Sequence, residues 1–214
     1  MNKDEQFVIT INRELGSGGR TVGEKLAAKL GVPFYDKALI KALEKKYNLT
    51  VEEIERMKGR SHSWWADFKR IVSIGEGLSD IHYYQVSIGS EPDILTTDEM
   101  YNAEKEILKS IAEEESCVIA GRTGFHILRN CPNRLSILIQ ASMEHRINRV
   151  MSKHPEMSRE EVEKTIKNVD KMRENYVNKY CRVSRYDTRN YDLVITMDGK
   201  TEDEIADLIY TYIG

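Results

Sequence analysis

A glycine-rich turn near the N-terminus holds the residues whose types and spacing are best suited to chemistry. It follows a short apolar run, and helical spacing begins within it. Glycines allow several backbone N–H groups to converge on one point, and the N-terminus of a helix adds partial positive charge. The pattern therefore predicts a binding site for an anion, above all for phosphate. The residues of the turn are Gly16, Ser17, Gly18, Gly19, Arg20 and Thr21.

The end of this turn matches the end of the P-loop pattern G-x-x-x-x-G-K-[ST]. Arg20 takes the position of the lysine and Thr21 supplies the hydroxyl for Mg²⁺, whereas Glu14 stands at the position of the first glycine. Arginine is a planar fork that binds phosphate oxygens in pairs, whereas lysine is a flexible point charge. The dinucleotide pattern G-x-G-x-x-G fits less well, because its third glycine falls on Thr21. A turn with a purely structural function is the remaining alternative.

Two groups of charged side chains lie at helical spacing in the second half of the chain. Arg146, Arg149 and Lys153 are three or four residues apart and share one helical face. Asp170 and Arg173 lie one turn apart. Such groups often form only a solvated face or a helical ion pair, which contributes ~0.3 to 0.5 kcal/mol. The spacing alone leaves both interpretations open.

Short apolar runs alternate with helical periodicity along the chain, which is typical of parallel strands joined by crossover helices. Continuous apolar runs, such as residues 135–139, indicate strands that are covered on both faces. The predicted fold is therefore α/β, a three-layer sandwich with a parallel sheet flanked by helices. We predict five strands, over residues 7–11, 33–35, 117–120, 135–139 and 192–196.

The predicted helices begin at recognisable signals. The first runs over residues 19–30, a long one runs from Ser158 to about residue 180, and the last ends near residue 213. Capping boxes, in which a Ser or Thr is followed three residues later by Glu, are predicted at three starts. They pair Thr50 with Glu53, Ser158 with Glu161 and Thr201 with Glu204.

Residues 48–97 are too many for a plain crossover between the second and third strands, so we predict a helical insertion there. Trp64 and Trp65 fall in an aromatic stripe at helical spacing. One interpretation is a helix that packs on the sheet or on a partner subunit, as in a homodimer. The other is a mobile cover over the substrate, hinged at glycines.

The bulk properties of the chain limit the classes of function. Its 214 residues fit one compact domain. With 32 Lys+Arg against 35 Asp+Glu, the net charge of −3 gives no global electrostatic reason to bind nucleic acid or an anionic membrane. No run approaches the ~20 apolar residues that span a bilayer, so we expect a soluble, cytoplasmic protein. The three cysteines lack metal-binding spacing and are expected to be free thiols.

Several motifs occur together and in order: the opening strand and turn, Phe-Tyr-Asp-Lys at 34–37, Val-Ile-Ala-Gly-Arg at 118–122, and Tyr-Asp-Leu at 191–193. With them, the chain resembles the cytidylate kinase-like family of P-loop kinases over nearly its whole length. The resemblance implies one P-loop kinase-like domain over residues 1–214. The insertion at 48–97 would lie on the acceptor side, and residues 146–189 would form a lid over the triphosphate.

The resemblance also implies roles for single residues. Asp36 and Arg122 would bind the acceptor nucleotide, with Arg122 clamping its phosphate. The local alternatives are a helix cap for Asp36 and a salt bridge at a strand end for Arg122.

The lid would supply further charged groups. Arg146 and Arg149 would bind substrate phosphates at the start of the lid. Arg173 would neutralise charge on the transferring phosphoryl group, and Asp170 would orient Arg173 or the acceptor.

The function expected from these residues is a kinase. It would move the γ-phosphoryl group of ATP or another nucleoside triphosphate, with Mg²⁺, to a small phosphorylated acceptor such as CMP. Its partners would be small nucleotides. One alternative is a nucleotide-binding regulator that has lost catalysis, which Glu14, Arg20 and the absence of acids in residues 120–123 would favour. Another is a nucleic-acid-binding module that uses the arginines within residues 182–189.

Overall fold

The computed structural model describes residues 1–36, 98–121 and 123–214, apart from the side chains of residues 99 and 100. The chain forms two compact units. The first comprises residues 1–36 and 111–214, and the second comprises residues 37–110. The glycine-rich turn and the predicted lid both belong to the first unit, which is therefore the one that carries the candidate site.

The predicted insertion at 48–97, with Trp64 and Trp65, lies outside the described residues, and so does the predicted capping box of Thr50 and Glu53. The single domain expected over the whole chain stays a prediction.

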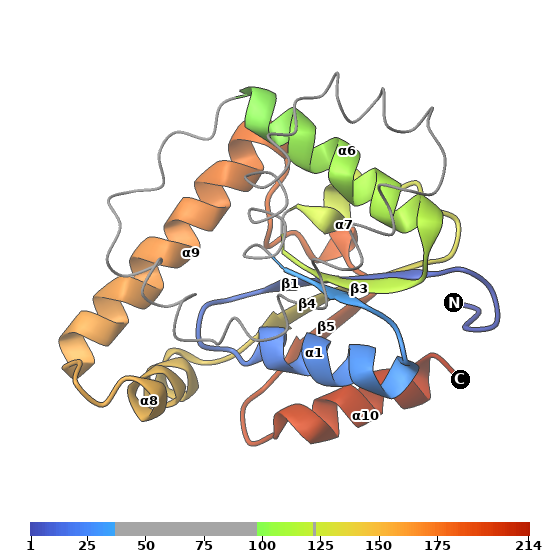
Figure 1. Cartoon of the computed structure of the whole chain (residues 1–214). Helices are drawn as coiled ribbons and strands as arrows, with labels where there is room; N and C mark the ends of the chain where they lie inside the picture. Colours follow the sequence, from blue (N-terminus) through green and yellow to red (C-terminus); the bar gives the residue numbers. More distant parts are fainter. Residues whose placement is uncertain (37–97, 122) are drawn as a thin grey trace. The chain divides into compact units, whose positions relative to one another are not determined.

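A five-stranded parallel sheet forms the centre of the first unit, in the order β2-β3-β1-β4-β5 (Figure 1). The central strand β1 pairs with β4 as far as Arg13, opposite Ile139, so it extends past its predicted end at Ile11. This pairing carries Asn12 and Arg13 to the carboxyl edge of the sheet. The strands are β1 Val8–Arg13, β2 Phe34–Tyr35, β3 Cys117–Ala120, β4 Arg134–Gln140 and β5 Leu193–Thr196.

Helices flank this sheet, and the predicted α/β fold is confirmed. In Figure 1, α1 and α10 lie on one side of the sheet and α7 on the other, while α8 and α9 follow β4. The described helices are α1 Gly19–Leu30, α6 Asp98–Glu114, α7 Gly124–Ile127, α8 Met143–Lys153, α9 Arg159–Cys181 and α10 Glu202–Tyr212, with a short 3₁₀ helix at Thr188–Asn190.

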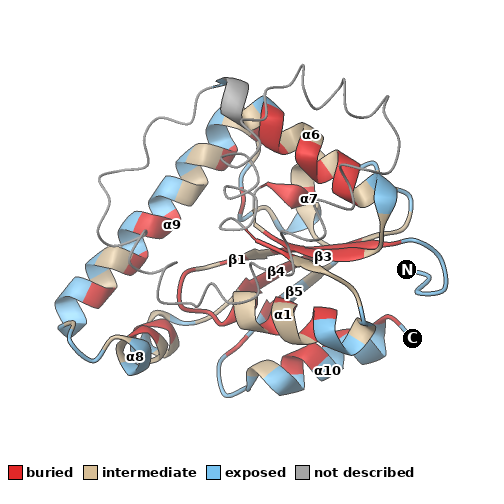
Figure 2. Cartoon of the chain, in the orientation of Figure 1, coloured by how far each residue is buried: buried red, intermediate tan, exposed pale blue. Residues whose placement is uncertain are grey.

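The main core lies between the sheet and the pair α1 and α10. Ile9 and Ile11 of β1 are buried against Leu26 of α1 and Ile209 of α10. In Figure 2 buried residues recur along both helices, while the outward face is mostly intermediate in exposure on α1 and mostly exposed on α10. Each helix therefore buries one face, as an amphipathic helix does. The packing fixes where α1, and with it the glycine-rich turn, begins.

The long helix α9 is amphipathic. Val162, Ile166 and Val169 are buried, and charged residues cover the other faces. Its N-terminus has the predicted capping box of Ser158 and Glu161. Within the described ranges, no helix combines the length and the apolar character that crossing a bilayer requires.

The capping box at the start of α10 allows a direct test. The hydroxyl of Thr201 accepts from the amide of Glu204 at 3.2 Å, and the carboxylate of Glu204 accepts from the amide of Thr201 at 2.7 Å. We expect Thr201→Ala to lower the free energy of unfolding by about 1 kcal/mol, because both bonds are lost or weakened. Denaturant unfolding measures this change. Thr211→Ala, an exposed position within the same helix, serves as the control and should leave stability nearly unchanged.

Candidate phosphate-binding site

The glycine-rich turn ends β1 and begins α1 as predicted. Gly16 and Gly18 both have φ of +82°, and Gly18 is the N-cap of α1, whose first residue is Gly19. Among the described residues, no acceptor takes a hydrogen bond from the amides of Gly16, Gly18 or Thr21. N–H groups of this kind at a helix N-terminus bind phosphate readily. The turn can therefore act as an anion site.

Two of the glycines are required by close contacts as well. A Cβ on Gly16 would lie 2.8 Å from the carbonyl oxygen of Arg146, and one on Gly19 would lie 2.7 Å from Cβ of Arg13. Neither distance is compatible with a side chain at an unchanged backbone. The turn is thus enclosed by α8 on one side and by the end of β1 on the other.

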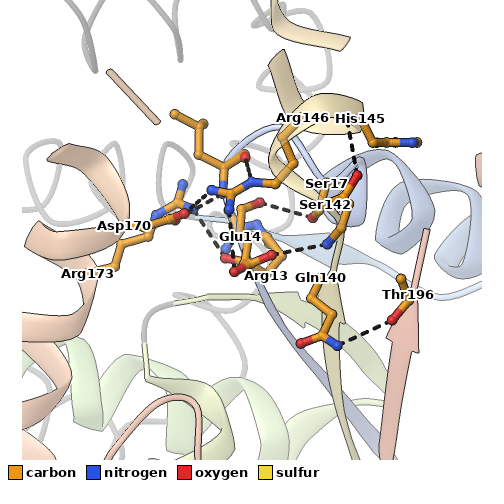
Figure 3. Close-up of polar contacts among 12 residues, drawn as sticks. Arg13, Glu14, Ser17, Gln140, Ser142, His145, Arg146, Asp170, Arg173 and Thr196 are labelled. Carbon is orange, nitrogen blue, oxygen red and sulfur yellow. Dashed lines mark hydrogen bonds and ion pairs between the residues drawn. The ribbon is translucent and has the colours of Figure 1, made fainter. Parts of the chain in front are cut away.

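A buried ion pair braces the turn against α8 and α9. Arg146 and Asp170 are 5% and 8% exposed, and their side chains form a short charged hydrogen bond (Figure 3). Nε of Arg146 donates to the carbonyl oxygen of Leu15 at 2.7 Å, and the amide of Leu15 donates to Asp170 at 3.0 Å. Both backbone groups of the residue before Gly16 are therefore held. The solvated-face alternative is wrong for Arg146.

Glu14, which departs from the P-loop pattern, has a structural role at the same place. Its carboxylate accepts from the amide of Ala141 at 3.1 Å and lies 3.4 Å from Nη1 of Arg146. Its own amide donates to the carbonyl oxygen of Ile139 at 3.1 Å. Glu14 thus joins the turn to the end of β4, and Figure 3 shows it below the pair of Arg146 and Asp170.

The structure brings Arg20 and Asp36 together. Nε of Arg20 donates to Asp36 at 2.8 Å, and its Nη1 lies 2.8 Å from Glu24. The guanidinium also lies 5.8 Å from the ring centre of Phe34. Asp36 is 4% exposed at the end of β2. The residue assigned to the donor phosphates therefore contacts the residue assigned to the acceptor, a pairing that spacing in the sequence did not indicate.

Arg149 lies in front of the turn. Its Nη2 donates to the hydroxyl of Thr21 at 3.1 Å and to Glu202 at 2.7 Å, and its Nε donates to Glu202 at 3.0 Å. Burial disfavours the charged form of Glu202, but the hydrogen bonds from Arg149 and from its own backbone amide, together with the nearby charges of Arg149 and Lys153, outweigh it, so the pKa of Glu202 lies below its usual range. Glu202 is the first residue of α10, and no local sequence signal connected it with the turn.

The surroundings of Thr21 fit Mg²⁺ that arrives with a nucleotide. In the part of the chain that the structure describes, no three His, Cys, Asp or Glu side chains gather to hold a metal ion. Mg²⁺ bound to nucleotides keeps several water molecules and takes most other ligands from phosphates, so one hydroxyl from the protein suffices. Thr21 would supply that hydroxyl once Arg149 moves aside.

Two arginines meet at the carbonyl oxygen of Arg13. Arg173 donates to it from Nη1 at 3.2 Å, and the same nitrogen lies 3.6 Å from Asp170. Arg185 donates to it from Nη2 at 2.6 Å. The sequence had placed Arg185 only within an arginine-rich segment, and the structure buries it. Arg122, assigned to the acceptor phosphate, lies outside the described residues.

Comparisons with known proteins agree with this architecture. The sequence profile of the cytidylate kinase-like family matches residues 8–199. The crystal structure of an uncharacterised protein from Eubacterium ventriosum ATCC 27560 is similar with a TM-score of 0.69 and 26% identity, covering 97% of this chain and 98% of that one. Shikimate kinase from Bacteroides thetaiotaomicron shares the fold at a TM-score of 0.51 and 14% identity, covering 98% and 99% of the two chains. Comparison with curated proteins gives no match.

Gly16 provides one test of the enclosed turn. We expect Gly16→Ala to cost more stability than Gly199→Ala, although both residues have positive φ, +82° and +69°. Each alanine pays about 1 to 2 kcal/mol for the left-handed backbone, but only the one at position 16 meets a backbone atom, whereas nothing lies within 4 Å at position 199. Unfolding in denaturant gives the difference. Equal losses for the two variants would contradict the close contact with Arg146.

The buried ion pair of Arg146 and Asp170 allows a second test. Removing one partner of a buried ion pair leaves the other charge uncompensated, so we expect Asp170→Asn to lower the free energy of unfolding by about 3 kcal/mol. The double variant Arg146→Met/Asp170→Leu should be more stable than the sum of the single changes predicts, because neither charge is left behind. Glu163→Gln, which breaks an exposed pair with Lys167 on the same helix, is the control and should change little. Strict additivity would show that the two charges do not interact.

Proposed function

Because the chain belongs to the cytidylate kinase-like family, we propose that it transfers the γ-phosphoryl group of ATP or another nucleoside triphosphate to a small phosphorylated acceptor, such as CMP. The observation that carries the proposal is the turn at the N-terminus of α1, where the amides of Gly16, Gly18 and Thr21 have no acceptor among the described residues. Such a cradle suits the phosphates of the donor. In the proposed role, Gly16 to Thr21 hold the donor, and Mg²⁺ at Thr21 neutralises part of its charge when bound.

The reaction itself needs little covalent chemistry from the protein. An oxygen of the acceptor forms a bond to the γ-phosphorus, and the bond to the β–γ bridging oxygen breaks, with its electron pair leaving on the nucleoside diphosphate. Catalysis then depends on positioning and on neutralising charge. Arg173 is suited to this role, because Asp170 and the carbonyl oxygen of Arg13 orient its guanidinium at the carboxyl edge of the sheet. Asp170 would act as a positioning residue.

Arg20 and Asp36 would work as a pair. Arg20 leaves the first turn of α1, directly after the glycines, and reaches Asp36 at the end of β2. Its charge thus lies between the proposed donor site and the side on which the acceptor is expected. In this proposal Arg20 stabilises charge that develops during transfer, and Asp36 holds its guanidinium in place and contacts the acceptor.

The remaining assignments keep their status as proposals. Arg146 would support the turn through its ion pair with Asp170, and Arg149 would contact the donor phosphates after leaving Thr21. Arg122 would clamp the phosphate of the acceptor. A cytoplasmic location and a homodimer that uses the insertion at 48–97 complete the proposal.

One set of contacts favours a second function. Arg20 is engaged by Asp36 and Glu24, and Thr21 by Arg149, so both residues assigned to the donor already contact protein groups. A regulator that binds nucleotide without transferring phosphate would tolerate these contacts. Calorimetry with ATP and Mg²⁺, followed by a turnover assay with a panel of acceptors, separates the two functions. Binding without ATP consumption for any acceptor would favour the regulator.

Arg20 is the residue whose replacement tests the kinase. We expect Arg20→Ala to lower turnover roughly 100-fold or more while the protein remains folded, because a charge that stabilises the transition state is lost. The measurement is ATP consumption with nucleoside monophosphates, their deoxy forms and small phosphorylated metabolites as acceptors. Lys29→Ala, at the far end of the same helix, removes only a surface pair with Asp207 and should leave turnover unchanged. Wild-type rates in Arg20→Ala would reject the assignment.

A further inference from the structure

Arg185 is a buried guanidinium that the protein satisfies only in part. Its side chain is 1% exposed. Nη2 donates to the carbonyl oxygen of Arg13 at 2.6 Å and to Oδ1 of Asn12 at 3.2 Å. Nε and Nη1 have no hydrogen-bond partner among the described residues. Buried polar groups are normally paired, so N–H groups left over on a buried cation call for an explanation.

No carboxylate among the described residues forms an ion pair with Arg185. In contrast, three other arginines around the turn have a carboxylate partner: Arg20 has Asp36, Arg146 has Asp170, and Arg149 has Glu202. Burial lowers the pKa of Arg185, and the nearby Arg173 lowers it further. A desolvated charge without a counter-ion is costly. Folding alone therefore does not account for an arginine at this position.

The residue is nevertheless held in place. The hydroxyl of Tyr191 donates to the carbonyl oxygen of Arg185 at 2.7 Å, and Asn12 contacts the same hydroxyl. Burial raises the pKa of Tyr191 to about 12, so this donor keeps its proton at neutral pH. The ring of Tyr186 lies 5.2 Å from the guanidinium. The residue is thus fixed before any ligand arrives, as a binding group should be.

The position of Arg185 is that of a ligand site. Arg13 is the last residue of β1, immediately before the glycine-rich turn, and ligands of open parallel sheets bind at the carboxyl ends of the strands. Arg173 reaches the same carbonyl oxygen of Arg13 at 3.2 Å. Two guanidiniums thus converge at one point, next to the amides proposed to hold the donor phosphates.

We infer that Arg185 and Arg173 together bind a phosphoryl group of the substrate. The inference deepens the proposed function and rests on it for the identity of the substrate. A phosphate dianion has several terminal oxygens, so two guanidiniums can bind it at once. In Arg185, the N–H groups of Nε and Nη1 lack an acceptor among the described residues, so they remain available to donate to phosphate oxygens. The phosphate would supply the counter-charge that the described protein groups do not provide.

The test compares three variants of the full-length protein with wild type. Arg185→Met removes the charge and keeps most of the volume, and Arg185→Lys keeps the charge but loses the fork. Arg189→Met is the matched control, because Arg189 lies in the same segment with its side chain 88% exposed and pairs only with Asp187 among the described residues. The probe is inorganic phosphate, and its binding is measured by thermal denaturation and calorimetry. The same measurements with a nucleoside monophosphate and with ATP show whether the phosphate of the acceptor or that of the donor occupies the site.

The expected result has two parts. Phosphate should stabilise the wild type and Arg189→Met equally, and bind Arg185→Met at least about tenfold more weakly, with Arg185→Lys in between. Without phosphate, Arg185→Met should be as stable as wild type or more so, because it removes an uncompensated charge. A structural residue would behave in the opposite way, with a lower melting temperature and unchanged phosphate affinity. That result, or a wild type that does not respond to millimolar phosphate, would overturn the inference.

Turnover separates this inference from the proposed function. If wild type transfers phosphate to no acceptor while Arg185→Met loses phosphate binding, the anion site stands and the kinase proposal fails. If wild type is active and Arg185→Met binds phosphate and turns over normally, the kinase stands and the site at Arg185 fails. If Arg185→Met does not fold, Arg185→Lys decides, since wild-type phosphate affinity in that variant would contradict recognition by the guanidinium group.

Discussion

The buried ion pair between Arg146 and Asp170 holds the glycine-rich turn in its observed conformation. A pair of this kind contributes little net stability compared with a well-packed apolar contact, because both charges must be desolvated. Its contribution is positional. By binding the carbonyl oxygen and the amide of Leu15, the two side chains fix the peptide that precedes Gly16, and they tie β1, α8 and α9 together at one point. Asp170 also lies 3.6 Å from Arg173, so one carboxylate orients both arginines.

Two departures from the P-loop pattern acquire a physical meaning in this structure. Glu14, at the position of a glycine, bonds the amide of Ala141 and approaches Arg146, so it takes part in the support of the turn. Arg20, at the position of the lysine, extends to Asp36 rather than lying over the turn. Both changes add charge close to the anion site, and the protein balances that charge internally. The charged groups around the turn thus form a network, in which Arg185 has no carboxylate partner among the described residues.

The sequence predicted those parts of the molecule that local physics determines. The glycines of the turn and the helical spacing after them placed the start of α1 correctly, and the capping boxes placed the starts of α9 and α10. Contacts between distant segments could not be predicted in this way. The spacing left open whether Arg146 belongs to a solvated face, because periodicity does not show that Asp170 of another helix pairs with it. Arg185 and Glu202 reach the site only through the packing of segments far apart in the chain.

Arg149 already donates a hydrogen bond to the hydroxyl of Thr21, and the carboxylate of Glu202 holds its guanidinium in place. In the proposed role, an incoming nucleotide would have to displace Arg149 from Thr21, and the free energy of that internal contact would be subtracted from its affinity. In enzymes whose rate is limited by the release of product, a side chain that competes with the nucleotide for its site favours rapid release of the nucleotide over tight binding.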